Sequence, residues 1–192
     1  MAGAFVCDDY RRAPLSRQHG GVIKLEGSCH CGKVHFSVDS KAPYPFMRCY
    51  CSICRKTAGG GGYAINLHGD AATLTVRGQK HVKVYRMRLD RTAGGRDQPN
   101  ASRKKSSGRR HFCGECGSAL WVYDPEWPEL VHPFASAIDS TLPVPPETVD
   151  IMLQSPPNWA EDPSGPTHIH FGAYPKESIE AWHRRHGLWD KQ

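Results

Sequence analysis

Seven of the eight cysteines in this chain fall into three short clusters, and this grouping constrains the fold more than any other feature of the sequence. In chain order the clusters are a C-x-C of Cys29 and Cys31, a C-x-C-x-x-C of Cys49, Cys51 and Cys54, and a C-x-x-C of Cys113 and Cys116. Such spacings let neighbouring sulfur atoms point at one ion from a single turn of backbone. The clusters therefore predict metal sites around which the rest of the chain must be arranged.

The first and third clusters together supply four thiolates, which we call the four-cysteine group, and the middle cluster supplies three, which we call the cysteine trio. Zinc held by four protein ligands is structural, whereas zinc held by three keeps a position for water or substrate. We therefore predict a structural zinc at the four-cysteine group. The alternative, buried cysteines that pack as small apolar side chains, does not explain the paired spacings or the adjacent Gly32 and Gly117.

The cysteine trio leaves three interpretations open. It can hold a catalytic-type zinc whose fourth position takes water or a thiol, and such an ion deprotonates a bound thiol at neutral pH. It can be a second structural site completed by one of the eleven histidines, with His168 and His170 as the candidates. It can also be a redox dithiol of Cys51 and Cys54, although such a pair needs only two sulfurs. We favour the open zinc site on spacing.

The composition predicts a mainly β protein with a core of its own. The chain has 192 residues, 39% of them hydrophobic, and its 19 glycines and 15 prolines favour turns and strands over a helical bundle. Residues 1–20 are expected to form a flexible leader without the apolar stretch of a secretory signal, and residues 21–192 one zinc-binding domain. No apolar run is long enough to span a membrane. We expect a cytoplasmic protein, with the nucleus as the alternative location, because clustered cysteines in a reducing compartment bind metals.

The net charge of +6 is concentrated in one segment, residues 90–110, which holds seven lysines and arginines against two aspartates. Its glycine, serine and charge content predicts a mobile, solvated loop. A nucleic-acid contact through residues 103–110 is the alternative, which is disfavoured because the run lacks interleaved aromatic residues.

Local patterns place the clusters on strands and turns. Strands are expected at residues 22–26, 34–38, 46–48, 63–67, 73–76, 82–87, 119–123 and 130–137, a helix at 176–183, and mostly coil at 142–168. Beside the cysteine trio, Arg55 and Lys56 could bind an anionic substrate. Gly59 and Gly60 of the following glycine run would allow close approach of a ligand to the backbone.

Three stretches together resemble the glutathione-dependent formaldehyde-activating enzyme family, which includes the centromere protein V group. They are residues 27–32 (GSCHCG), 49–60 (CYCSICRKTAGG) and 112–120 (FCGECGSAL). The resemblance covers residues 22–185, and residues 174–188 look like the ending of fungal members. The order and spacing of these cysteines are far more specific than a lone C-x-x-C.

The resemblance implies an all-β, Mss4-like β-tent fold with a structural zinc at the four-cysteine group and a catalytic zinc at the trio, two Zn²⁺ per chain. It implies a carbon–sulfur lyase that adds glutathione to formaldehyde to give S-(hydroxymethyl)glutathione. No general base is identified, with His170 and His183 as weak candidates. The alternative function is a non-enzymatic zinc scaffold that binds a protein or nucleic acid through the basic loop.

Overall fold

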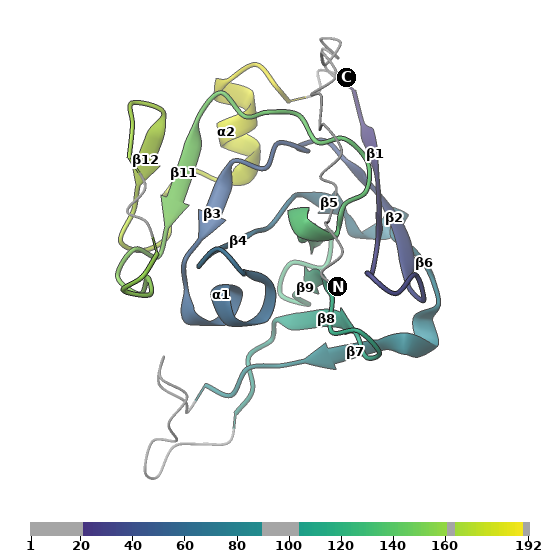
Figure 1. The fold of residues 1–192 in the computed structure, drawn as a ribbon. Coiled ribbons are helices and arrows are strands. Elements are labelled where there is room, and N and C mark those ends of the chain that lie inside the picture. The colour runs from purple at the N-terminus through teal and green to yellow at the C-terminus, as the bar shows by residue number, and fades with distance from the viewer. Residues whose placement is uncertain (1–20, 90–103, 161–163, 190–192) are drawn as a thin grey trace, which may run out of the picture.

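Strands predominate in the computed structural model of the protein, which describes residues 21–89, 104–160 and 164–189 (Figure 1). The predicted leader at residues 1–20, and Cys7 with it, lie outside the described residues, as does the 90–103 part of the basic loop. The mainly β fold with a short C-terminal helix is confirmed. None of the helices in the described ranges is long and apolar enough to cross a membrane.

The first sheet is the antiparallel hairpin that the sequence predicts, extended by one further strand. Its strands are, in spatial order, β1 (Ile23–Ser28), β2 (His35–Ser40) and β6 (Thr75–Arg77). Burial alternates strictly along β2, as expected for a strand with one face on a core. The β1–β2 turn carries Cys29 and Cys31 and contains Gly32 at φ 72°, a conformation that glycine adopts without strain.

The second sheet is antiparallel and has five strands. In spatial order they are β5 (Gly69–Asp70), β10 (Leu130–Pro133), β9 (Ala119–Tyr123), β8 (Arg109–Cys113) and β7 (Val82–Tyr85). The prediction that Arg109 and Arg110 belong to the basic loop is wrong, because β8 pairs with both β7 and β9. Residues 104–106 also pair back onto residues 87–89, with the Ser106 N–H donating to the Met87 carbonyl at 2.8 Å.

The third sheet joins segments that are far apart in the sequence. Its order is β12 (His168–His170), β11 (Thr148–Ile151), β3 (Met47–Cys49) and β4 (Ala64–Ile65). β11 runs parallel to both of its neighbours. Apart from β11 and the first residue of β12, the described residues of 142–168 are coil and turns, in agreement with the expectation of mostly coil. β11 forms because Val149 and Ile151 are buried in a core and Asp150 has a partner on β3.

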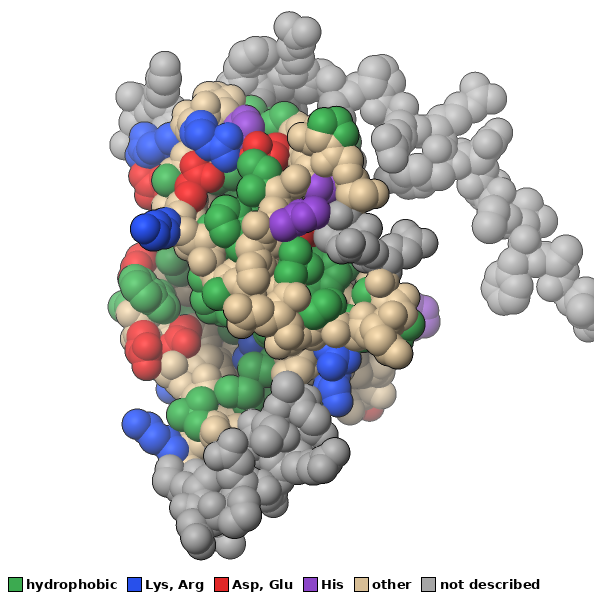
Figure 2. Space-filling view, turned by 90° about the vertical axis from the view of Figure 1, so that its left-hand side faces the viewer, with side chains coloured by type: hydrophobic (Ala, Val, Ile, Leu, Met, Phe, Trp, Pro, Cys, Tyr) green, Lys and Arg blue, Asp and Glu red, His purple; other side chains and the backbone are tan. Residues whose placement is uncertain are grey.

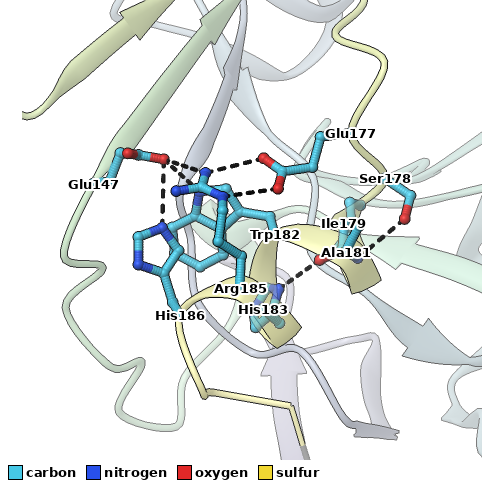
Figure 3. Close-up of polar contacts among 9 residues, drawn as sticks. All are labelled: Glu147, Glu177, Ser178, Ile179, Ala181, Trp182, His183, Arg185 and His186. Atoms are coloured by element: carbon cyan, nitrogen blue, oxygen red, sulfur yellow. Dashed lines mark hydrogen bonds and ion pairs between the residues drawn. The ribbon is translucent and has the colours of Figure 1, made fainter.

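Two α-helices accompany the sheets within the described residues. α1 (Ser52–Ala58) follows the cysteine trio and was not predicted, whereas α2 (Ile179–Arg185) corresponds to the predicted terminal helix. α2 begins three residues later than expected because Ser178 caps it, its hydroxyl accepting a hydrogen bond from the Ala181 N–H at 3.1 Å (Figure 3). Single 3₁₀ turns occur at Ala71–Thr73, Gln79–His81 and Ala135–Ala137.

The helix α2 covers the core that contains the cysteine trio. Trp182 stacks on Phe46 with ring centroids 3.9 Å apart, and both belong to the hydrophobic cluster that includes Cys49 and Cys54. Glu147 fixes the helix from β11's side by accepting hydrogen bonds from Trp182 Nε1 and from Arg185, both at 2.8 Å (Figure 3). α2 is therefore a packing element of the trio's core.

His183 on α2 makes stability depend on pH. It is fully buried, and its Nδ1 donates to the Ile179 carbonyl at 2.8 Å (Figure 3), while burial lowers the pKa of His183 to about 4 from an ordinary 6.5. The charges of His68 and His186 act in the same direction. The His183 imidazole therefore binds a proton more readily in the unfolded chain than in the folded one. Folding stability is unaffected by this difference above pH 6.5, and it decreases as the pH falls from 6.5 toward 4. The full loss amounts to about 3 kcal/mol.

We expect a His183→Asn variant, which keeps a donor for Ile179 and does not titrate, to lose less stability than the native chain over this range. Urea unfolding at several pH values measures the difference. Release of metal in acid affects both proteins, so it cancels in the comparison. If the stability of both proteins changed equally with pH, His183 would not be the source of the pH dependence. This burial also removes His183 from the candidates for a general base, since solvent and substrate do not reach it.

Candidate metal centres

The structure brings the four cysteines of the first and third clusters together. Their sulfur atoms lie within 4.8 Å of one another. The Sγ atoms of Cys29 and Cys31 are 3.5 Å apart, and those of Cys31 and Cys113 are 3.7 Å apart. In a tetrahedral zinc site with Zn–S bonds of about 2.3 Å, neighbouring sulfurs lie about 3.8 Å apart. The four-cysteine group therefore has the dimensions of a closed zinc site.

Local hydrogen bonds favour the thiolate form of Cys29 and Cys116. The Val34 N–H donates to the Cys29 sulfur at 3.2 Å. Hydrogen bonds from the Ser118 hydroxyl and backbone lower the pKa of Cys116 to about 5. A thiolate is the form that binds a metal. The site joins the β1–β2 turn to the β8–β9 turn, and it is an integral part of the fold.

The cysteine trio lies where β3 passes into α1. Cys49 ends β3, Cys51 caps α1 by accepting the Cys54 N–H at 3.4 Å, and Cys54 lies in the first turn. The three sulfurs lie within 4.8 Å of one another. Cys49 and Cys54 are buried, and Cys51 is half-buried. A segment of only six residues therefore brings three sulfur atoms together.

The close approach of three thiols makes the trio suited to a cation. Hydrogen bonds from the thiols of Cys49 and Cys54 lower the pKa of Cys51, and the hydrogen bond to Cys51 is the main cause that raises the pKa of Cys49. Without a cation, the three sulfurs thus share their protons and do not all ionise. A bound dication lets all three deprotonate. Three thiolates at this separation fit zinc.

The histidines that could have closed the trio lie elsewhere. His168 and His170 group with Asp150, while the trio has no fourth His, Cys, Asp or Glu ligand among the residues described. The reason lies in the third sheet, where Arg48 pairs with Asp150 and Cys49 with Ile151. Because successive side chains of a strand point to opposite faces, Arg48 and the histidine group lie on one face of β3 and Cys49 on the other.

The Asp150 group is satisfied by protein side chains. Arg48 binds the buried Asp150 carboxylate with both Nε (2.6 Å) and an Nη atom (3.0 Å), and His168 Nδ1 lies 2.9 Å from it. The Arg48 guanidinium also lies 5.0 Å from the centre of the Tyr63 ring. Figure 2 views the β11–β12 side of the molecule, where histidine side chains reach the surface. A guanidinium already neutralises this carboxylate, so we read the group as an ion pair that locks β3 to β11.

The residues predicted to bind substrate near the trio differ in how exposed they are. Arg55 is half-buried with its Nε unpartnered among the described residues, and Lys56 is exposed. A Cβ atom at Gly59 would collide with the Tyr63 carbonyl, so this glycine is required by packing. Gly60 has open space around it. Their contact with a substrate stays a prediction.

Sequence reasoning missed two residues that interact electrostatically with the trio. The charge of Arg110, on β8, acts on the Cys54 thiol, and the Tyr174 hydroxyl lies within electrostatic range of all three sulfurs and of Arg110. Arg110 was counted with the basic loop, because Arg109, Arg110 and His111 are all polar and do not show the alternation typical of a strand. Tyr174 carries no signal in the sequence that links it to the trio.

Three β-sheets arranged around two cysteine groups able to hold metal ions define a metal-site β protein of the kind that the cysteine spacings predict. The model of the family "Glutathione-dependent formaldehyde-activating enzyme" matches residues 24–155. The chain belongs to this family, as the resemblance indicated. A protein of Halomonas elongata, whose name assigns it provisionally to these enzymes, is 59% identical over 164 residues, covering 85% of this chain and 97% of its own.

A solved structure shows a weaker likeness. The crystal structure of a Rhodobacter sphaeroides protein superposes with a TM-score of 0.43 and 25% identity, covering 63% of this chain and 92% of its own.

Proposed function

We propose that the protein is a zinc-dependent enzyme of the carbon–sulfur lyase class that adds the thiol of glutathione to formaldehyde. The observation that carries the proposal is a trio of converging sulfurs without a fourth protein ligand in the described part of the chain. The family and the Halomonas relative support the substrate pair by their names. The proposed partners are thus a small thiol and an aldehyde.

Two Zn²⁺ ions per chain are proposed, one at the four-cysteine group and one at the trio. At the trio, bound zinc would supply Lewis acidity that keeps a substrate thiol ionised at neutral pH. In the reaction the sulfur lone pair forms a bond to the formaldehyde carbon, and the C=O π pair moves to oxygen, which takes a proton. The Tyr174 hydroxyl, which interacts electrostatically with the three sulfurs, is a candidate donor of that proton.

The non-enzymatic alternative has less support. Arg109 and Arg110, which it assigned to a mobile contact loop, lie in β8, and Lys105 forms a β-bridge with Arg88. The remaining residues of that loop, 90–103, lie outside the described residues. No observation on the described residues favours a nucleic-acid partner.

Metal content and product formation test the proposal together. Protein prepared without chelators is expected to carry about two zinc ions per chain, because both ligand sets fit zinc. Mixing it with glutathione and formaldehyde is expected to accelerate the appearance of the S-hydroxymethyl signal in an NMR time course. The chain with its metal removed by a chelator serves as the control. A chain with two zinc ions that leaves the uncatalysed rate unchanged would contradict the function.

A further inference from the structure

The outer edge of β7 is a free strand edge within the described part of the chain. β7 ends the second sheet, where it pairs with β8 alone (Figure 1). The chain extends this edge as far as Leu89, because residues 87–89 pair with residues 104–106, which lead into β8. A free edge presents unpaired backbone donors and acceptors to which another extended chain can add.

The hydrogen-bond pattern shows which backbone groups face outward. In the register of β7 and β8, Val82 lies opposite Cys113. One position further along, the Gly114 N–H donates to the His81 carbonyl at 2.8 Å, which makes this a hydrogen-bonded pair. Because such pairs alternate with non-hydrogen-bonded pairs, the N–H and C=O of Val84 point away from β8. No described residue outside the sheet forms a hydrogen bond with them.

Other strand edges among the described residues are covered or shorter. Residues 138–140 cover the outer side of β1, where the Asp139 N–H donates to the Glu26 carbonyl at 2.8 Å. β4 and β5 have two residues each, and β6 and β12 have three. The edge of β7 is therefore the longest one that the described residues leave open.

Apolar side chains on this edge are exposed. Val84, Tyr85 and Leu89 leave 50%, 40% and 51% of their surface accessible. Val84 and Tyr85 point to opposite faces, since successive side chains of a strand alternate. A strand added beside β7 would therefore gain backbone hydrogen bonds together with apolar contacts on both faces.

The same segment is strongly basic. Residues 71–89 contain five lysines and arginines and no aspartate or glutamate. Lys83 and Arg86 are exposed, and Arg86 Nε donates to the Ser106 carbonyl at 2.9 Å, which orients the guanidinium. A second copy of the chain would bring the same two cations to the shared edge, and like charges across paired strands are destabilising. The charge thus disfavours self-pairing and is complementary to acidic side chains.

We propose that the edge of β7 is a docking site for an acidic, extended segment of another protein. This segment adds as a strand through the outward backbone groups of Val84 and places carboxylates near Lys83 and Arg86. In this mode of recognition the main-chain hydrogen bonds provide affinity and the side chains provide specificity. The inference does not depend on the reaction proposed for the cysteine trio.

The experiment measures, by fluorescence anisotropy on the full-length, zinc-loaded chain, the Kd of a peptide of about eight alternating glutamates and valines, a common strand length. Lys83→Gln/Arg86→Gln is expected to weaken binding about five- to tenfold, because exposed ion pairs contribute modestly. Lys24→Gln/Lys176→Gln removes the same charge from exposed positions on other elements and is expected to change the Kd less than about twofold.

Val84→Pro separates strand addition from charge attraction alone. Proline removes the outward N–H of residue 84 and is tolerated at strand edges whose N–H does not serve the ladder. Binding is expected to fall at least about tenfold although both cations remain. If this variant does not fold, an acidic peptide with N-methyl groups on alternate amides, which cannot pair as a strand, replaces it in a comparison on the native chain.

Three results would overturn the proposal: no binding of the acidic peptide to the native chain, equal binding of a peptide with lysine in place of glutamate, or undiminished binding after the proline or N-methyl change. An oligothymidylate that binds the native chain more tightly than the peptide does, and binds Val84→Pro equally well, would also overturn it, because the edge would then contact nucleic acid. Weaker binding in both the charge variant and the strand-addition test, with the Lys24→Gln/Lys176→Gln control unchanged, supports the docking site.

Discussion

Replacing Cys113 with serine is expected to leave the chain without a folded state at neutral pH. Cys113 is fully buried at the end of β8, and its sulfur lies 3.7 Å from that of Cys31. Structural zinc contributes roughly 10–16 kcal/mol to folding in small zinc domains, while the net stability of a whole domain is only about 5–15 kcal/mol. If loss of one thiolate prevents zinc binding at the four-cysteine group, the folding free energy that is lost is as large as the net stability of the whole domain.

Far-UV circular dichroism and size-exclusion chromatography measure this effect directly. Cys7→Ser is the matched control, because Cys7 belongs to neither cysteine group, and it is expected to behave like the native chain. A Cys113→Ser variant that unfolds cooperatively at the native temperature would show that the four-cysteine group is dispensable for the fold.

The second large effect is expected from Cys54→Ser, which should abolish catalysis and preserve the fold. Serine is close in size to cysteine, and the Cys51 cap of α1 uses the backbone N–H of residue 54, which the substitution retains. The trio would nevertheless lose a thiolate, and with it the metal ion that the proposed mechanism requires. We expect product formation to fall at least about 1,000-fold, on the order of 4 kcal/mol in the activation barrier.

The comparison of the two variants separates the two sites. NMR rates, zinc content and melting temperature are measured for both, with one zinc ion expected to remain in the Cys54→Ser protein. If this variant unfolds as Cys113→Ser does, then the trio is a structural site and the proposed mechanism loses its basis. The direction of each effect thus assigns each ion its role.

The grouping of the cysteines could be predicted because short-range spacing limits how many sulfurs reach one ion. The β1–β2 hairpin could also be predicted, because apolar and polar residues alternate along residues 34–38, and burial alternates in the same way along β2. The trio has no fourth His, Cys, Asp or Glu ligand in the described part of the chain, which agrees with the expected three-ligand site, although spacing alone did not exclude His168 or His170. The strand geometry that places Arg48 and Cys49 on opposite faces of one sheet decides between these alternatives.

The remaining features depend on contacts between distant residues, which local patterns do not contain. β11 lies in a proline-rich segment, and its central Asp150 is stable when buried because Arg48, 102 residues earlier, neutralises it. Arg110 was counted as loop charge because its neighbours at 103–105 and 109 are also basic. Only the pairing of β8 with β7 and β9 shows that it belongs to the second sheet.

The two halves of the four-cysteine group are synthesised at different times. Cys31 precedes Cys113 by 82 residues, a stretch that a ribosome needs roughly 4–16 s to synthesise at about 5–20 residues per second. During that interval the nascent hairpin presents two unsatisfied sulfurs to oxidants and to competing metals. We therefore expect maturation to depend on reducing conditions that keep the early thiols reduced until Cys113 and Cys116 have been synthesised.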